Sequence, residues 1–273
     1  MDNLILIPGV FYLASTAGYI GYLFRNRSGF HRAGHLLLWT GFVLHSLVLA
    51  AIAVKTARVP AANLHETLSV AGWALAGVFL FFQRRFDVKV LGAYAAPLVT
   101  VVVIAALHFP QSQVPLKTAM TSLWLLVHIA TVFIGDAAFA LAAGLGLLYL
   151  AQERAIKGKR HGFFFKRLPS LEQLDNAGYG CIVTGFAFLT FGLITGFVYA
   201  QWIWGRFWSW DPKEVWSSIT WLLYAALLHQ RLAMGWRGRR SAMMAMIGFA
   251  VVLFTFLGVN ILLKGHHGEF TRW

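Results

Sequence analysis

The chain has 273 residues, of which 59% are hydrophobic and only 12% are charged. Soluble domains carry about 25% charged and about 45–50% apolar residues, so this composition excludes a water-soluble globule. The single cysteine excludes an internal disulfide, a CxxC redox pair and a cysteine-rich zinc site. The net charge of +13 would suggest nucleic acid in a soluble protein, but in so apolar a chain it predicts basic loops on one side of a membrane.

Eight apolar stretches are each suited to a membrane-spanning helix, because a bilayer core of about 30 Å requires about 20 residues. The first is expected to be a true span, since it has neither the basic start nor the cleavage site of a secretory signal peptide. The fifth is too long, so one of its ends is expected to project from the membrane. We therefore predict an all-α integral membrane protein, a single domain 1–273 whose spans cover about 3–24, 33–54, 66–83, 88–108, 121–150, 177–200, 215–234 and 241–263.

Four of the connecting loops contain 16 of the 23 Lys and Arg residues, and these loops alternate with the others along the chain. Because cytoplasmic loops are enriched in Lys and Arg, we expect these four loops to be cytoplasmic and both termini to lie outside. The longest, about 151–176, has room for an interfacial helix. The distribution of charge over four short loops excludes nucleic acid as a partner. The histidines among these basic residues are expected to be solvated, namely His31, His35 and His161.

Five of the 11 Trp residues fall within one predicted outer loop, residues 202–216. An aromatic belt explains one or two Trp at a helix end, but not this density. Indole rings offer a rigid stacking surface for a flat apolar ligand, and Arg206 and Lys213 are placed to pair with carboxylates. A planar macrocycle with propionates, such as haem, fits these features. The spacing of a helix N-cap, a first-turn Pro and an acidic third residue predicts that the next helix begins in the loop, at Asp211, Pro212 and Glu214.

The segment Trp204-Gly205-x-x-Trp208-Ser209-Trp210-Asp211-Pro212-Lys213-Glu214-x-Trp216 resembles the WWD signature of haem-handling membrane proteins. Its form is that of the CcsA/ResC branch of cytochrome c biogenesis (System II), whereas the CcmC and CcmF branches differ after the Asp. The resemblance continues through 221–231, through Gly258-Val259-Asn260 and through Asn63-Leu64-His65-Glu66-Thr67, and it covers about 40–267. It implies cofactor contacts in the loop at Trp202, Trp204, Arg206, Trp208, Trp210, Asp211, Lys213, Glu214 and Trp216.

Haem iron needs axial ligands, usually His, and the predicted topology gives the depth of each candidate. His128 is predicted near the outer surface, level with the Trp loop, and His266 and His267 follow the last span at the same surface. The resemblance implies one outer ligand before the long cytoplasmic loop and one after the last span. His128 matches the first and His267 the second, with His266 as the adjacent alternative.

Two further histidines, His45 and His229, are predicted in the middle to inner bilayer, where ionisable groups are costly and usually functional. The resemblance implies that His229 is a haem ligand within the membrane, and His45 is a plausible opposite ligand. Together they would hold a second haem nearer the cytoplasm. His65 is a candidate to line the outer pocket, and the sequence gives no account of Asp136.

The resemblance implies a chain that binds haem b, one haem or two, through pairs of His ligands and presents it outside for attachment to the CxxCH thiols of apocytochrome c. A CcsB/ResB-type membrane protein is the implied partner, and the plasma membrane is the implied location. The chain is expected to contribute positioning to a haem lyase complex, with no catalytic nucleophile of its own. The alternatives are a HemX-like regulator of haem biosynthesis and a b-type dihaem electron carrier.

Overall fold

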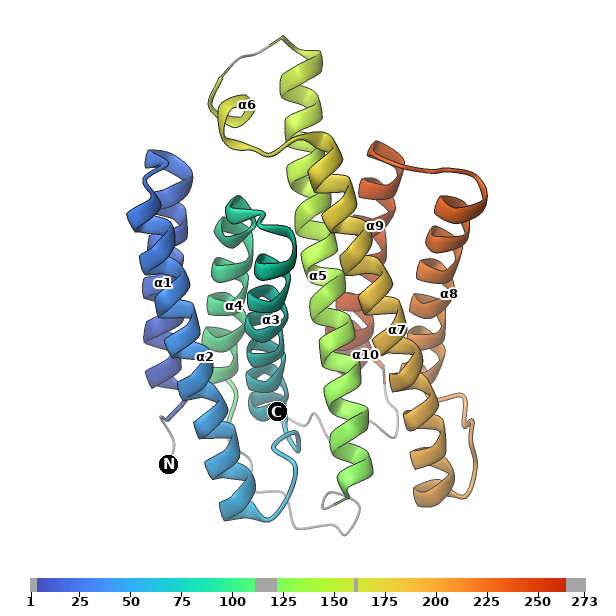
Figure 1. Ribbon diagram of the computed structural model, residues 1–273. Helices are drawn as coiled ribbons and strands as arrows, with labels where there is room; N and C mark the ends of the chain where they lie inside the picture. The colour runs from blue at the N-terminus through green and yellow to red at the C-terminus, as the bar shows by residue number, and fades with distance from the viewer. Residues whose placement is uncertain (1–3, 111–121, 160–161, 264–273) are drawn as a thin grey trace.

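The computed structural model describes residues 4–110, 122–159 and 162–263. Over these residues the chain forms helices and no strand, as the sequence predicts. The long helices run up and down in one bundle, so that successive connections fall at opposite ends (Figure 1). The helices are α1 Leu6–Arg25, α2 Ser28–Thr56, α3 Leu64–Phe86, η1 Lys89–Leu91, α4 Gly92–Leu107, α5 Leu123–Lys157, α6 Phe163–Arg167, α7 Leu171–Trp204, α8 Pro212–Ala233, α9 Arg239–Leu253, the π turn η3 Phe254–Gly258 and α10 Val259–Leu262.

Seven helices of the described chain are long and apolar enough to cross a membrane, which makes the protein a multi-pass membrane protein. The helix α8 was expected as an eighth span and forms as a 22-residue helix in the bundle, but it is not among the seven. Its sequence is diluted by Ser, Thr and charged residues. The 35 residues of α5 extend about 52 Å at 1.5 Å per residue, so this helix projects beyond a 30 Å core, as predicted.

The described basic loops share one end of the bundle. The connections 26–27, 87–88, 158–170 and 234–238 lie at the top of Figure 1, where α6 also lies, and 57–63 and 205–211 lie at the bottom. The short helix α6 falls within the loop for which an interfacial helix was expected. The connections rich in Lys and Arg therefore lie at one end of the bundle, and the less basic connections lie at the opposite end.

The bundle is held together most extensively between α5 and α7. A Cβ added to Gly135 would come within 3.1 Å of the Gly185 carbonyl oxygen, so the two backbones approach as closely as small residues permit. Nearby, the Phe139 and Tyr224 rings stack with centroids 3.5 Å apart, joining α5 to α8. At the basic end, Asp175 and Arg231 form an ion pair of 2.7 Å that ties α7 to α8.

Candidate functional site: a cavity at the Trp loop

The Trp loop begins where α7 ends and is closed by a capping box. Gly205 adopts the left-handed conformation (φ 70°) and its N–H donates to the Gln201 carbonyl at 3.0 Å, which terminates α7. Asp211 is the N-cap of α8 and accepts the Lys213 N–H at 2.9 Å, with Pro212 in the first turn and Glu214 at the third position. The predicted start of this helix is confirmed.

The two acidic residues of the loop are occupied in folding it. The Glu214 carboxylate accepts the Ser209 N–H at 2.8 Å, the Ser209 hydroxyl at 2.9 Å and the Asp211 N–H at 3.2 Å. Asp211 is buried, and its carboxylate caps the first turn of α8. Both side chains were expected to contact a cofactor, which stays a prediction; the structure shows that they also fix the path of the loop.

The five Trp rings lie in different surroundings. Trp204 lines a cavity, whereas Trp202 and Trp210 are 64% and 77% exposed. Trp208 packs edge-on against Trp210 with ring centroids 5.5 Å apart. Trp216, one turn into α8, packs on Phe254 of the π turn. The loop therefore has one ring inside and an exposed aromatic surface outside, and Arg206 is exposed beside them.

The cavity behind the loop has a volume of about 210 Å³. Its walls come from α5, α7, α8 and the end of α9 with the π turn, and the connection 57–63 closes one side. The walls are mostly apolar, with five ionisable side chains among them, His128, Asp136, Tyr199, Lys213 and Glu214.

His128 stands on α5 against α7, and its position fixes its protonation. Nδ1 lies 2.9 Å from the Gly192 carbonyl oxygen, which only accepts, so Nδ1 carries the proton. A Cβ on Gly196 would lie 2.7 Å from the His128 Cε1 atom, so only glycine lets the ring lie here. A histidine whose Nδ1–H donates to a carbonyl binds a metal through Nε2, and such a carbonyl partner is typical of metal-ligating histidines.

Asp136 and Lys213 face the same cavity from α5 and α8. Among the described residues, no hydrogen bond or ion pair joins the Asp136 carboxylate to the Lys213 ammonium group. Ser217 and Thr220 follow Lys213 at helical spacing and line the cavity with it, so one polar face of α8 looks into the cavity.

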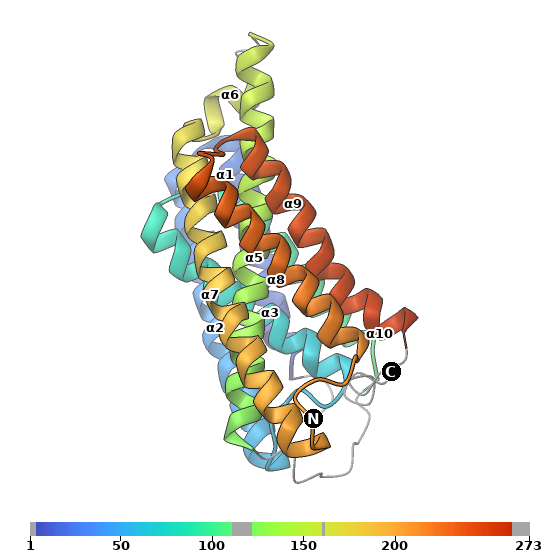
Figure 2. The same ribbon diagram turned by 90° about the vertical axis from the view of Figure 1, so that its right-hand side faces the viewer.

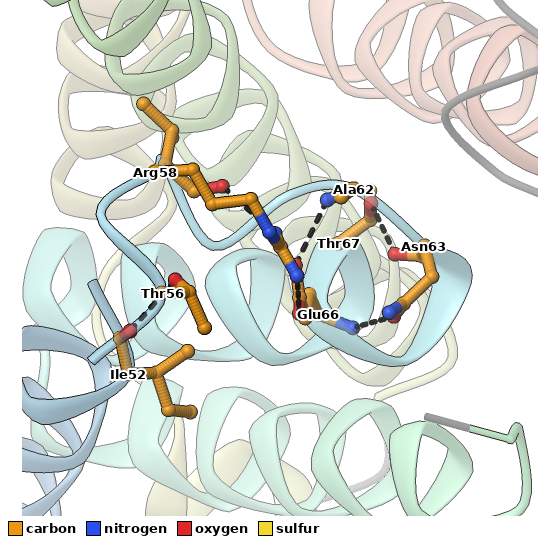
Figure 3. A network of polar contacts seen from close by, with 8 residues as sticks. Ile52, Thr56, Arg58, Ala62, Asn63, Glu66 and Thr67 are labelled. Atoms are coloured by element: carbon orange, nitrogen blue, oxygen red, sulfur yellow. Dashed lines mark hydrogen bonds and ion pairs between the residues drawn. The ribbon is translucent and has the colours of Figure 1, made fainter. Parts of the chain in front are cut away.

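The connection 57–63 is locked by an ion pair that the sequence analysis did not predict (Figure 3). The Arg58 guanidinium donates to both oxygens of Glu66, at 2.6 and 2.7 Å, and Glu66 also accepts the Ala62 N–H at 2.9 Å. This pairing raises the pKa of Arg58 above its ordinary value. Asn63 caps α3 by accepting the Glu66 N–H, and this Asn-x-x-Glu spacing is the one local signal the sequence offers.

The structure does not bring His45 and His229 together. His45 is fully buried, with Tyr12 Oη 3.2 Å from Nδ1 and Ser69 Oγ 2.8 Å from Nε2. His229 lies on the exposed face of α8. In Figure 1, α2 and α8 stand on opposite sides of the bundle with α5 between them, and Figure 2 shows the bundle from the side on which α8 lies. One haem held by both side chains does not fit this arrangement.

The remaining histidines have other surroundings. His266 and His267 lie outside the described residues. His65 is buried, does not line the cavity, and donates through Nδ1 to the Ala106 carbonyl at 2.8 Å.

Two histidines were expected in a solvated loop but lie on α2 at the basic end. His31 and His35 bond to opposite atoms of the Gln83 amide on α3, at 2.7 and 3.0 Å. The structure therefore corrects the expectation that these two are solvated, because a helix that continues past the predicted boundary buries them partly.

A family model described as "Cytochrome C assembly protein" matches residues 61–267. Similar curated proteins include the cytochrome c biogenesis protein CcsA of Guillardia theta, 32% identical over 91% of this chain and 89% of its own length. The CcsA of Synechococcus sp. (strain CC9902) is 35% identical over 78% of both chains. A solved structure of the cytochrome c haem lyase CcmF has a similar fold (TM-score 0.64, 18% identity), covering 98% of this chain and 48% of that chain.

Fold and cavity together define a multi-pass helical membrane protein with a Trp-rich loop beside a partly enclosed apolar cavity. The chain belongs to the cytochrome c assembly family, which confirms the resemblance seen in the sequence. Within this family it is of the CcsA type, because its curated relatives match over most of both chains.

Proposed function

We propose that this chain binds haem b at the cavity beside the Trp loop and presents it for covalent attachment to apocytochrome c. The observation that carries the proposal is His128, which lines an apolar cavity and donates through Nδ1 to the Gly192 carbonyl, the arrangement typical of metal-ligating histidines. His267, with His266 as the alternative, is the predicted opposite ligand. Two His ligands saturate the iron and favour a centre that does not bind oxygen.

The chemical types of the residues at the site suit haem. Apolar walls and the Trp204 ring suit the flat macrocycle, and Lys213 suits a carboxylate. When bound, haem supplies the vinyl groups to which the cysteine thiols of an apocytochrome add. The chain's own cysteine, Cys181, is buried away from the cavity. The protein's contribution is therefore to bind and orient, and the thiols come from the acceptor.

The position of His229 supports a second haem site shared with a partner. Leu222, Ala226 and His229 lie on one exposed face of α8, so the imidazole is a polar group on an apolar surface. His45 is enclosed elsewhere, and we place the opposite ligand of such a site on a partner. A CcsB/ResB-type membrane protein is the proposed source, and this arrangement disfavours a self-contained dihaem electron carrier.

The orientation in the membrane follows the loop charges. We propose that the basic end faces the cytoplasm of a plasma membrane and that the Trp loop faces outward, because cytoplasmic loops are rich in Lys and Arg. The haem site then lies on the side where an exported apocytochrome arrives.

The test is haem staining of c-type cytochromes in a strain that lacks this protein and is complemented with variants. His128→Ala is expected to abolish the stained cytochromes. His108→Ala is the matched control, because His108 is exposed and only donates to the Ile104 carbonyl of its own helix. Normal staining with His128→Ala, or in the strain without the protein, contradicts the proposal. Altered haem synthesis with normal cytochromes would instead identify a HemX-like regulator.

A further inference from the structure

Asp136 and Lys213 are charged residues that neither the fold nor the capping of α8 explains. Asp136 lies 13 residues into α5, about 20 Å along the helix axis. Ionisable groups within a membrane-spanning helix are expensive and usually functional. Two ion pairs of the described chain are buried on both sides, Arg58–Glu66 and Arg231–Asp175, and in each the charged groups are in direct contact. Asp136 and Lys213 line the same cavity without such a contact between them.

The gap between these two side chains is part of the cavity. Both line it, together with Ser217 and Thr220 on the polar face of α8, so the charges are aimed at its contents and not at each other. A carboxylate group that enters the cavity would find an ammonium group and two hydroxyl-bearing side chains on one helix face. Charge-assisted bonds of this kind are stronger than neutral ones.

Geometry also sets a direction for the ligand. His128 precedes Asp136 by eight residues, so it is about 12 Å nearer the end of the bundle where α5 begins. Figure 1 shows that α8 begins deeper in the bundle than the point where α7 ends, which places Lys213 on the inner side of the loop. The iron ligand therefore lies toward the open end, and the charged pair lies toward the interior.

We propose that Lys213 binds a propionate carboxylate of haem and that Asp136 positions the Lys213 ammonium group for this contact. The proposal rests on the proposed haem site and adds an orientation. The propionates of haem occupy one edge of the ring, and the vinyl groups lie on the other half. With the propionate edge held inward, the vinyl groups point to the open end, where the thiols of an apocytochrome arrive.

The test compares haem with its dimethyl ester, which keeps the iron and the ring but has no carboxylates. Each is titrated into the purified protein in detergent, with empty micelles subtracted, and affinity is read from the Soret band. The unmodified protein is expected to bind haem about 10-fold or more tightly than the ester, the usual effect of one charge-assisted bond. Lys213→Met is expected to remove this preference and to leave ester binding unchanged.

Two variants test whether Lys213 acts through its charge and whether Asp136 positions it. Lys213→Arg is expected to keep most of the preference for haem, and Asp136→Asn to reduce it while ester binding persists. Lys55→Met is the matched control, because Lys55 is an exposed lysine at the same end of the bundle, and it is expected to keep the full preference. Retained ester binding also shows that a variant is folded.

Equal affinity of the unmodified protein for haem and ester overturns the proposal, provided that His128→Ala still removes the Soret band. So does a Lys213→Met variant that weakens both ligands equally. If instead neither ligand binds, or binding is indifferent to His128→Ala, the haem site itself is refuted. The two failures are therefore distinguishable.

Discussion

The ion pair between Arg58 and Glu66 is expected to hold one wall of the cavity in place, and replacing Glu66 with Gln tests this. The side chains are only 7% and 11% exposed, and two short bonds join them. Removing one partner of such a buried pair costs about 3–5 kcal/mol, because the other charge stays buried without compensation. The Glu66→Gln change also weakens the acceptor for the Ala62 N–H.

The expected result is local opening of residues 57–63, measured by hydrogen–deuterium exchange of their backbone amides in detergent. A loss of about 3 kcal/mol corresponds to about a 100-fold faster exchange, since each 1.4 kcal/mol is a factor of ten. Helix α4 on the same protein should keep its protection. Haem affinity should fall as well, because Val59, Ala61 and Ala62 line the cavity.

The matched control is Asp87→Asn at the other end of the bundle. Asp87 and Lys89 form a pair of 3.7 Å whose side chains are 72% and 47% exposed. Exposed pairs contribute about 0–1 kcal/mol, so little change is expected. If exchange of 57–63 is unchanged by Glu66→Gln, or if both variants behave alike, the argument for a locked wall is refuted.

Two further predictions concern the site. Gly196→Ala is expected to displace His128, because the new Cβ would lie 2.7 Å from its ring, and to lower haem affinity by about 10-fold or more. Gly29→Ala is the control, because nothing lies within 4 Å of a Cβ at that position. Equal haem affinity in both variants contradicts the account. Asp211→Ala is expected to lower stability by about 1 kcal/mol through loss of the helix cap, seen as a lower midpoint of thermal unfolding; loss of haem binding at unchanged stability would instead indicate a direct role in the site.

The sequence predicts what depends on local patterns. Apolar stretches of about 20 residues gave the long helices, and the Asp-Pro-x-Glu spacing gave the start of α8, since a capping box needs only residues within one turn. Counting residues along α5 placed His128 level with the Trp loop, and the structure puts both at one cavity. These inferences need no knowledge of which helices are neighbours.

What depends on neighbours was not predictable. Whether His45 faces His229 is decided by which helices pack together. In the structure His45 forms hydrogen bonds with Tyr12 and Ser69. Likewise, the pairing of Arg58 with Glu66 depends on the fold of a loop with no regular period. For Asp211 and Glu214 the sequence predicted both a helix cap and ligand contacts; the structure confirms the cap, and the ligand contacts stay a prediction.

The central claim is that His128 ligates haem at the outer cavity, and the absorption spectrum of a His128→Gly variant with added imidazole tests it most directly. The purified variant is prepared in a His229→Ala background, so that only the outer site is observed. The account predicts that the Soret band of added haem is lost with His128→Gly and returns with imidazole, which replaces the missing ligand. A Soret band that is unchanged by His128→Gly, in both intensity and response to imidazole, would contradict it.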